Sequence, residues 1–207
     1  MREFIYFSGK ARTSGNFDDL MKAGRMDIVC HFIINAFFLS HKIREDTKLH
    51  LVFYGPPNPP MHLELFPGQL SEKTSIPETG MQVGDDKPDI SKKDIAGLIK
   101  KMLFKFKEGK KTRVWNGFYV EKKPLFKVIE ELKKEGKTIY LLDERGENIR
   151  NIKLGENPVF VLGDNEGFPQ KELRRLKKIC VPVSIGKKVY FASQVTTIVN
   201  HELDSRE

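Results

Sequence analysis

The sequence predicts an α/β fold: a mostly parallel sheet with helices on both faces. Short apolar runs rich in branched and aromatic residues alternate with helical segments, at spacings that suit crossover connections between parallel strands. Several of these runs are apolar throughout, as expected of strands covered on both faces. The 207 residues contain neither an internal repeat nor a linker-like stretch, so residues 1–207 are predicted to form a single domain.

The first third of the chain is predicted to hold two strands, a long loop and a buried helix. Arg2–Ser8 and Leu49–Tyr54 are rich in β-forming residues and are predicted to be the strands. Between them, Ser8–Gly24 is polar and carries three glycines, which predicts a long loop, and long loops in compact domains are often functional. Asp27 is predicted to be the N-cap of a helix over Ile28–His41, which is apolar nearly all round and therefore buried.

The middle of the chain begins with a capping signal. Ser91 and Asp94 have the spacing of a capping box, which predicts a helix running to about Lys107. The other elements predicted here are a short strand within Pro59–Pro67, a loop over Ser71–Ser91, a basic connector over Gly109–Val114 and a short strand over Trp115–Val120.

In the last third, Pro124 and Gly136 mark the limits of a helix over Leu125–Lys134. Three apolar strands, a charged helix before the third of them, and a terminal helix follow. The strands are predicted over Thr138–Leu142, Val159–Leu162 and Ile179–Val183, and the terminal helix over Phe191–Leu203.

These three strands end in comparable loops: Leu142-Asp143, Gly163-Asp164 and Ser184-Ile185-Gly186. Ligands of α/β sheets bind at the carboxyl ends of strands. Glycines there let the main chain approach a ligand closely, and Leu142, Ile185 and Val189 offer an apolar slot for a ring such as adenine. Three ordinary strand-to-loop turns would have the same sequence features.

Composition points to a polyanionic partner. Lys and Arg number 36 against 28 acidic residues, a formal charge of +8, which favours nucleic acid but also suits a merely soluble surface. Cys30 and Cys180 lie in apolar runs, as buried thiols of a reduced cytosolic protein do. The longest apolar segment, Ile28–Leu39, is too short to span a bilayer, and the chain enters a strand without a signal peptide. We therefore expect a cytoplasmic protein without a membrane partner.

Several catalytic classes lack their motifs. The five histidines share no ligand spacing with a cysteine or carboxylate, so no metal is expected. The sequence has no P-loop, no G-x-G-x-x-G after a strand and no G-x-S-x-G elbow.

Two basic regions are candidate RNA contacts. The loop Ser8–Gly24 and the residues after it offer cations that grip phosphate and carboxylates that take a proton when burial raises their pKa. A second tract, Lys107–Lys127, carries the aromatic residues Trp115, Phe118 and Tyr119 among its basic residues, a pattern suited to holding a nucleic-acid backbone and stacking bases. The alternatives are a solvated polar loop and a solvated lysine face over core aromatics.

The motifs, in this order, resemble the SPOUT superfamily of methyltransferases. They are GDNEGFP from Gly163, VPVSIG from Val181 and KKVYFASQ from Lys187. The segments SGKARTSGNFDDLMKAGRMDIVCHFI from Ser8 and GPPNPP from Gly55 narrow the resemblance to archaeal enzymes that methylate N1 of pseudouridine 54 in the T-loop of tRNA. The resemblance covers the whole chain.

The resemblance implies a deep trefoil knot at about residues 138–204, holding S-adenosylmethionine in a bent conformation, and a homodimer. Pattern arguments alone do not reveal a knot, because knots are essentially absent from ordinary folds. The cofactor-binding positions it implies are Leu142, Gly163, Cys180, Ile185, Gly186, Lys187, Lys188, Val189, Tyr190 and Phe191.

The late segment IGKKVYFASQ lacks the asparagine-serine motif of SPOUT ribose methyltransferases, which favours methylation of a base. Pseudouridine N1 carries a proton, so we expect Asp19 to accept or orient that proton and Arg25 to stabilise the developing anion. The RNA backbone is expected to contact Lys10, Arg12, Lys110, Lys111 and Arg113. A related enzyme acting on pseudouridine in ribosomal RNA, and a non-catalytic RNA-binding protein, are the alternatives.

Overall fold

The computed structural model describes residues 1–40, 42–70 and 91–206, so the loop predicted over Ser71–Ser91 lies outside the described residues except at Ser91. The strands are β1 Arg2–Ser8, β2 Thr47–Phe53, β3 Met61–Leu65, β4 Thr112–Trp115, β5 Phe118–Glu121, β6 Ile139–Asn148, β7 Val159–Gly163 and β8 Val181–Ser184. The α-helices are α1 Met26–Phe37, α2 Lys92–Phe104, α3 Leu125–Lys134, α4 Gln170–Ile179 and α5 Ala192–Asp204, with short 3-10 turns at Pro67–Gln69 and Ile149–Asn151.

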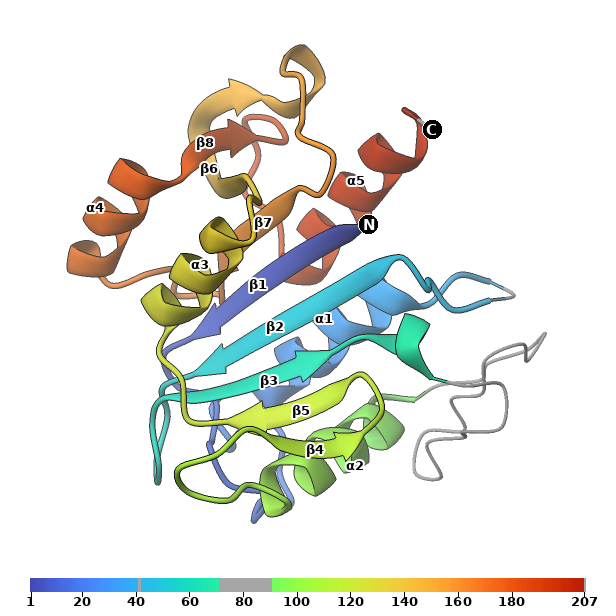
Figure 1. Cartoon of the computed structure of the whole chain (residues 1–207), viewed down its shortest axis with the longest axis vertical. Helices are drawn as coiled ribbons and strands as arrows, with labels where there is room; N and C mark the ends of the chain where they lie inside the picture. The colour runs from blue at the N-terminus through green and yellow to red at the C-terminus, as the bar shows by residue number, and fades with distance from the viewer. Residues whose placement is uncertain (41, 71–90, 207) are drawn as a thin grey trace.

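One eight-stranded sheet runs through the molecule in the order β4-β5-β3-β2-β1-β7-β6-β8 (Figure 1). The pairs among β2, β1, β7, β6 and β8 are parallel. Helices α1, α2 and α5 pack on one face, over a core that includes Phe4, Phe32 and Val199. Helices α3 and α4 pack on the other, over a core that includes Ile5, Ile129 and Leu176. The predicted mostly parallel sheet with helices on both faces is therefore confirmed.

The other edge of the sheet is antiparallel, which the sequence analysis did not predict. Strand β3 pairs antiparallel with β2 and β5, and β4 pairs antiparallel with β5. The single strand expected over Trp115–Val120 is wrong, because Gly117, with φ of 80°, turns the chain back between two strands. The basic connector expected over Gly109–Val114 likewise contains the start of β4.

The observed helix ends show which local sequence signals predicted a helix boundary correctly. The capping box at Ser91 and Asp94 is present, and α3 has the predicted limits. Asp27 is not the N-cap of α1: that position belongs to Arg25, which has left-handed backbone angles (φ 62°, ψ 42°), and Asp27 lies in the first helical turn. Among the helices of the described ranges, none has the length and apolar composition needed to cross a bilayer.

Candidate functional site

A cavity of about 490 Å³ lies at the carboxyl ends of β6, β7 and β8, within the roughly 300–1,000 Å³ typical of small-molecule sites. It is where the sequence analysis expected three strand-end loops to converge. Eight of the ten predicted cofactor-binding residues line it: Leu142, Gly163, Ile185, Gly186, Lys188, Val189, Tyr190 and Phe191.

The other two predicted cofactor residues are not among the residues that line the cavity. Cys180 is buried in the core beneath α3 and α4, on the opposite side of the sheet from α1 and α5, and this burial raises its pKa to about 11. A thiol so placed is a packing group. Lys187 precedes the lining residue Lys188 but does not itself line the cavity.

Further lining residues were not among the predicted cofactor-binding positions, although Asp143 and Asp164 belong to the predicted strand-end loops. Asp143 and Glu144 lie within β6, beyond the part that pairs with β7, Asp164 and Asn165 follow β7, and Gln194 comes from α5. Their signal was position, because polar residues at strand ends meet at one edge of the sheet. The side chains of Asp143, Glu144 and Asp164 give this edge negative charge, which suits a cationic ligand.

The carboxylate of Asp143 is held in place. Lys177 Nζ lies 2.6 Å from its Oδ2, and the Arg145 amide donates to its Oδ1 over 2.9 Å. Burial alone would raise the pKa of Asp143, but these contacts outweigh burial and lower that pKa. Asp143 therefore stays ionised at the cavity wall.

Glycines bring backbone segments together beside the cavity. A Cβ on Gly163 would lie 2.8 Å from Gly167 Cα, closer than a side chain allows. Gly167 and Gly186 have φ of 72° and 135°, a region that disfavours other residues. The β7 and β8 loops can therefore present main-chain amides and carbonyls to a ligand.

Asp164 joins the cavity to the long amino-terminal loop. The Ser8 hydroxyl donates to Asp164 Oδ2 over 2.7 Å, and the Gly9 amide donates to the same oxygen over 3.2 Å. Two residues further along both segments, Lys10 forms an ion pair with Glu166. The loop predicted to read the substrate thus begins at Ser8, which is hydrogen-bonded to a residue that lines the cavity.

The backbone of this loop is packed, while several of its polar side chains, among them Lys10, Asp18 and Asp19, are exposed. Its backbone at Lys10–Ala11 passes between Gly24 and Gly55, where a Cβ would lie 1.7 Å and 2.2 Å from the Lys10 carbonyl oxygen. Thr13 is buried and donates its hydroxyl to the Gly55 carbonyl over 3.0 Å. Contacts with the end of β2 hold the loop in one shape.

The two predicted catalytic residues differ in their surroundings. The Asp19 carboxylate is about half exposed and accepts hydrogen bonds from the amides of Met21 (2.9 Å) and Lys22 (3.2 Å). Arg25 donates two hydrogen bonds to Asp27, at 3.0 and 2.9 Å. A hydrogen bond from Arg25 lowers the pKa of Asp27, and the next residue, Ile28, lines the cavity. Asp27, which directly precedes this lining residue, is therefore a second carboxylate to consider besides Asp19.

The predicted RNA-contacting cations also divide into two groups. Lys111 pairs with Glu64 at 2.6 Å, and Lys10 pairs with Glu166. Arg12 keeps a buried Nε without a hydrogen-bond partner among the described residues. Lys110 and Arg113 are exposed, and no described carboxylate forms an ion pair with either.

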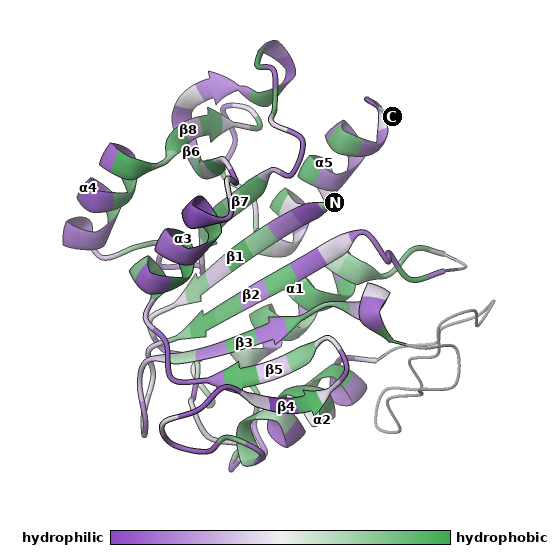
Figure 2. Ribbon diagram, viewed as in Figure 1, coloured by the Kyte–Doolittle hydropathy of each residue, from purple (hydrophilic) through white to green (hydrophobic). Residues whose placement is uncertain are grey.

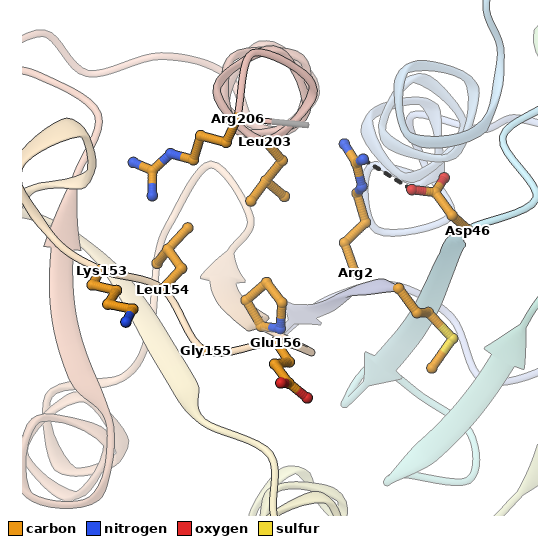
Figure 3. A pocket seen from close by; sticks show the side chains of 10 residues that line it. Arg2, Asp46, Lys153, Leu154, Gly155, Glu156, Leu203 and Arg206 are labelled. Carbon is orange, nitrogen blue, oxygen red and sulfur yellow. Dashed lines mark ion pairs between the residues drawn. The ribbon is translucent and has the colours of Figure 1, made fainter.

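A second cavity, of about 330 Å³, lies at the opposite end of the parallel strands. Figure 3 shows Leu203 of α5 and Arg206, which follows the helix, on one side of it and the ion pair of Arg2 with Asp46 on the other; the ion pair spans 2.9 Å. Its position at the amino ends of β1 and β7 is opposite to where α/β sheets bind ligands. We therefore assign the functional site to the first cavity.

Three buried residues that are not neighbours in the sequence, His50, His62 and Glu64, come close enough to hold a cation, which sequence spacing did not reveal. Figure 2 shows the hydrophilic residues that interrupt β2 and β3 here. Glu64 is already paired with two lysines, Lys48 at 2.8 Å and Lys111 at 2.6 Å. Hydrogen bonds and ion pairs thus account for this cluster without an ion.

Comparison with known proteins agrees with this site. The family described as "Putative SAM-dependent RNA methyltransferase" matches residues 1–207. A tRNA (pseudouridine(54)-N(1))-methyltransferase of Methanocaldococcus jannaschii is 36% identical over 100% of this chain and 98% of its own. One of Thermococcus onnurineus is 38% identical over 99% and 98%. The crystal structure of Archaeoglobus fulgidus Nep1 bound to S-adenosylhomocysteine shares the fold, with a TM-score of 0.56 at 14% identity over 98% and 96% of the two chains. The chain therefore belongs to the family of S-adenosylmethionine-dependent RNA methyltransferases.

Proposed function

We propose that this protein methylates N1 of pseudouridine 54 in the T-loop of tRNA, with S-adenosylmethionine as methyl donor. The observation that carries the proposal is the join at Asp164 between the strand-end cavity and the packed loop Ser8–Gly24. Relatives that match this chain from end to end carry that activity in their names.

The cavity fits the cofactor chemically. Leu142, Ile185 and Val189 provide apolar surface for the adenine ring, and the glycine loops provide backbone groups for its polar edge. Asp143 and Asp164 provide negative charge near a sulfonium cation. When bound, S-adenosylmethionine supplies an electrophilic methyl carbon to the nucleophile placed in line with it.

The residues of the chain prepare that nucleophile. The lone pair of N1 forms the new N–C bond while the methyl carbon–sulfur bond breaks, and the N1 proton leaves to a carboxylate or to water. Asp19 is the proposed acceptor, and Arg25 stabilises negative charge on the base. Asp27 binds Arg25 and directly precedes Ile28, which lines the cavity. Asp27 is therefore the second carboxylate whose substitution should be compared with that of Asp19.

Substrate binding uses the basic residues of the same edge and of the second tract. Arg12, with its unpartnered Nε, and Lys10 are proposed to contact phosphates near the target nucleoside. Lys110, Lys111 and Arg113 would extend the footprint along the RNA. The target base is stacked within the tRNA and has to be turned out to reach the cavity.

A trefoil knot in the carboxyl-terminal part is also proposed. Residues 143–158 cross close to β8, since a Cβ on Gly146 would lie 2.5 Å from the Val183 amide nitrogen. The same segment is tied to α5, because Arg150 donates to Glu202 over 2.6 Å and Arg206 donates to the Ile152 carbonyl over 3.2 Å. These contacts are those expected of a loop through which the chain between β8 and α5 passes.

A homodimer and a cytoplasmic location belong to the same proposal. The loop at the cavity carries exposed apolar side chains, Val189 at 86% and Phe191 at 66%, which a second copy would cover. A tRNA substrate places the enzyme in the cytoplasm.

Methyl transfer from labelled S-adenosylmethionine tests the function. We expect incorporation into a tRNA transcript that carries pseudouridine at position 54 and none into the same transcript with uridine there. Ribosomal RNA fragments containing pseudouridine form the third arm, and preferential labelling of these would replace the tRNA assignment. Calorimetry with the cofactor separates an enzyme from a simple RNA-binding protein, which should bind none.

A further inference from the structure

Phe104, the last residue of α2, exposes an aromatic ring on the protein surface. Its side chain is 67% exposed, which is unusual for phenylalanine. Part of the ring lies against Gly15 of the amino-terminal loop, where a Cβ would be 2.7 Å from Phe104 Cδ2. The ring therefore leans on the loop while most of its surface faces solvent.

Helix α2 and the loop are fastened together around this ring. Phe17 is buried, and Lys100 Nζ lies 5.0 Å from the centre of its ring. Lys100 Nζ also lies 3.2 Å from Asp18 Oδ1. Phe104 thus occupies a fixed position beside the loop that we propose binds the target nucleoside.

Unpaired cations follow this ring along the chain. Lys105, Lys107, Lys110 and Arg113 are exposed, and within the described ranges no carboxylate forms an ion pair with any of them. By contrast, the other lysines of the predicted tract form ion pairs: Lys111 with Glu64, Lys122 with Glu108, Lys123 with Glu121 and Glu131, and Lys127 with Glu130. Within residues 105–127, the cations without an ion pair to a described carboxylate therefore lie in segment 105–113, which follows α2.

The aromatic residues first considered for base stacking are already engaged. Phe118 is fully buried, Lys101 lies over the Trp115 ring at 5.2 Å, and Lys111 lies over the Tyr119 ring at 4.6 Å. Among residues 104–127, Phe104 is the most exposed aromatic residue, while Phe106, Trp115, Tyr119 and Phe126 are only partly exposed.

We propose that Phe104 stacks on an unpaired base of the tRNA substrate, with the cations that follow it binding the flanking phosphates. An aromatic ring beside free lysines suits RNA because it offers a stacking surface while the cations neutralise the backbone. A protein partner would be expected to cover more apolar area than one ring provides. The inference rests on the proposed tRNA substrate.

Equilibrium binding of the pseudouridine-54 transcript to the full-length protein, without cofactor, tests the role of Phe104. Phe104→Ala should weaken binding roughly 5- to 150-fold, the range for loss of one base–aromatic stack. Phe104→Tyr should bind as the wild type does, whereas Phe104→Leu, which keeps apolar bulk without the aromatic face, should resemble Phe104→Ala. Ile179→Ala, at another exposed apolar position, is the matched control and should leave affinity unchanged.

Fluorescence provides a direct readout. The chain has one tryptophan, so Phe104→Trp combined with Trp115→Phe reports on position 104 alone. Quenching on addition of the transcript is expected, and its absence would overturn the proposal.

Wild-type affinity in Phe104→Leu would also overturn it, because the ring would then act only as a support for Gly15. Dissociation of a dimer in Phe104→Ala, followed by sedimentation, would assign the ring to a protein interface instead. Wild-type methyl transfer is measured in parallel, so that failure of the tRNA assignment remains distinct from failure of the stacking.

Discussion

His50 Nδ1 lies 3.0 Å from His62 Nε2, between two strands that pair antiparallel. Each ring uses its other nitrogen to contact a carboxylate: His50 Nε2 lies 2.9 Å from Glu3, and His62 Nδ1 lies 3.2 Å from Glu121. The pKa of both carboxylates is lowered to about 2, because hydrogen bonds from histidine and lysine outweigh the effect of burial. Ionised carboxylates only accept hydrogen bonds, so each ring donates one N–H to its carboxylate.

This network predicts an acid-labile fold. Burial lowers the pKa of His62 from 6.5 to about 4. Between pH 6.5 and 4, His62 is therefore protonated in the unfolded chain but not in the folded chain. Stability is full above pH 6.5 and falls as pH drops toward 4. The carboxylates Glu3 and Glu121 add a second loss as pH falls from about 4.5 toward 2.

Melting temperature measured between pH 8 and 3 checks this. His62→Gln should flatten the decline between pH 6.5 and 4 and keep the decline below 4.5. His31→Gln, at an exposed position, should leave the wild-type profile unchanged. A melting temperature independent of pH from 7 to 4 in the wild type would contradict the prediction.

Gly24 should tolerate no side chain. It has φ of 72°, and a Cβ would lie 1.7 Å from the Lys10 carbonyl oxygen. Gly24→Ala should lower the free energy of unfolding by about 3 kcal/mol or more, from backbone strain and displacement of the loop. Gly136→Ala has a similar φ of 80° with nothing within 4 Å, so it should cost only about 1 kcal/mol. Chemical denaturation compares the two, and equal losses would show that the close approach is unimportant.

Substitution of Asp164 should weaken tRNA binding, although the residue itself lies in the wall of the cofactor cavity. Asp164→Ala removes the acceptor for Ser8 and Gly9, so we expect about a tenfold rise in KM for tRNA, from roughly 1.4 kcal/mol of lost ordering. Ser8→Ala should produce part of the same effect, and the double variant should be less than additive. Fully additive effects would mean that the two residues act independently.

The proton acceptor is identified by comparing two carboxylates. Asp19→Asn should lower kcat by about 10²-fold or more and leave affinity for S-adenosylmethionine nearly intact. Asp27→Asn should act through Arg25, so its loss should be reproduced by Arg25→Lys, which keeps charge but loses the paired hydrogen bonds. Flattening of the pH–rate profile in one variant alone marks the base. If kcat persists in both, water takes the proton.

Local sequence signals were sufficient where structure depends on neighbours along the chain. The Ser91 and Asp94 cap and the limits of α3 are of this kind. The packing of the polar loop could not be predicted, because it depends on Gly55, 31 residues beyond Gly24, meeting the Lys10 carbonyl. The His50–His62 contact depends on strand register: the residues are twelve apart and meet only because β2 and β3 pair antiparallel.

The same distinction holds at the site. Strand-end position located most of the cavity wall. Cys180 does not line the cavity because it ends α4 instead of lying on β8, and it packs in the core on the other face of the sheet. The carboxylates Asp143 and Asp164 were visible as strand-end residues but gave no sign of their partners, Lys177 and Ser8, which come from distant segments.

Asp164 also sets a thermodynamic condition on the reaction cycle. It belongs both to the wall of the cofactor cavity and to the anchor of the substrate loop. If the bound methyl donor raises the affinity for tRNA by some factor through this residue, bound tRNA raises the affinity for the donor by the same factor. A spent cofactor and a methylated tRNA obey the same reciprocity, so the affinity of the spent cofactor, measured with and without methylated tRNA, gives the coupling between the two products.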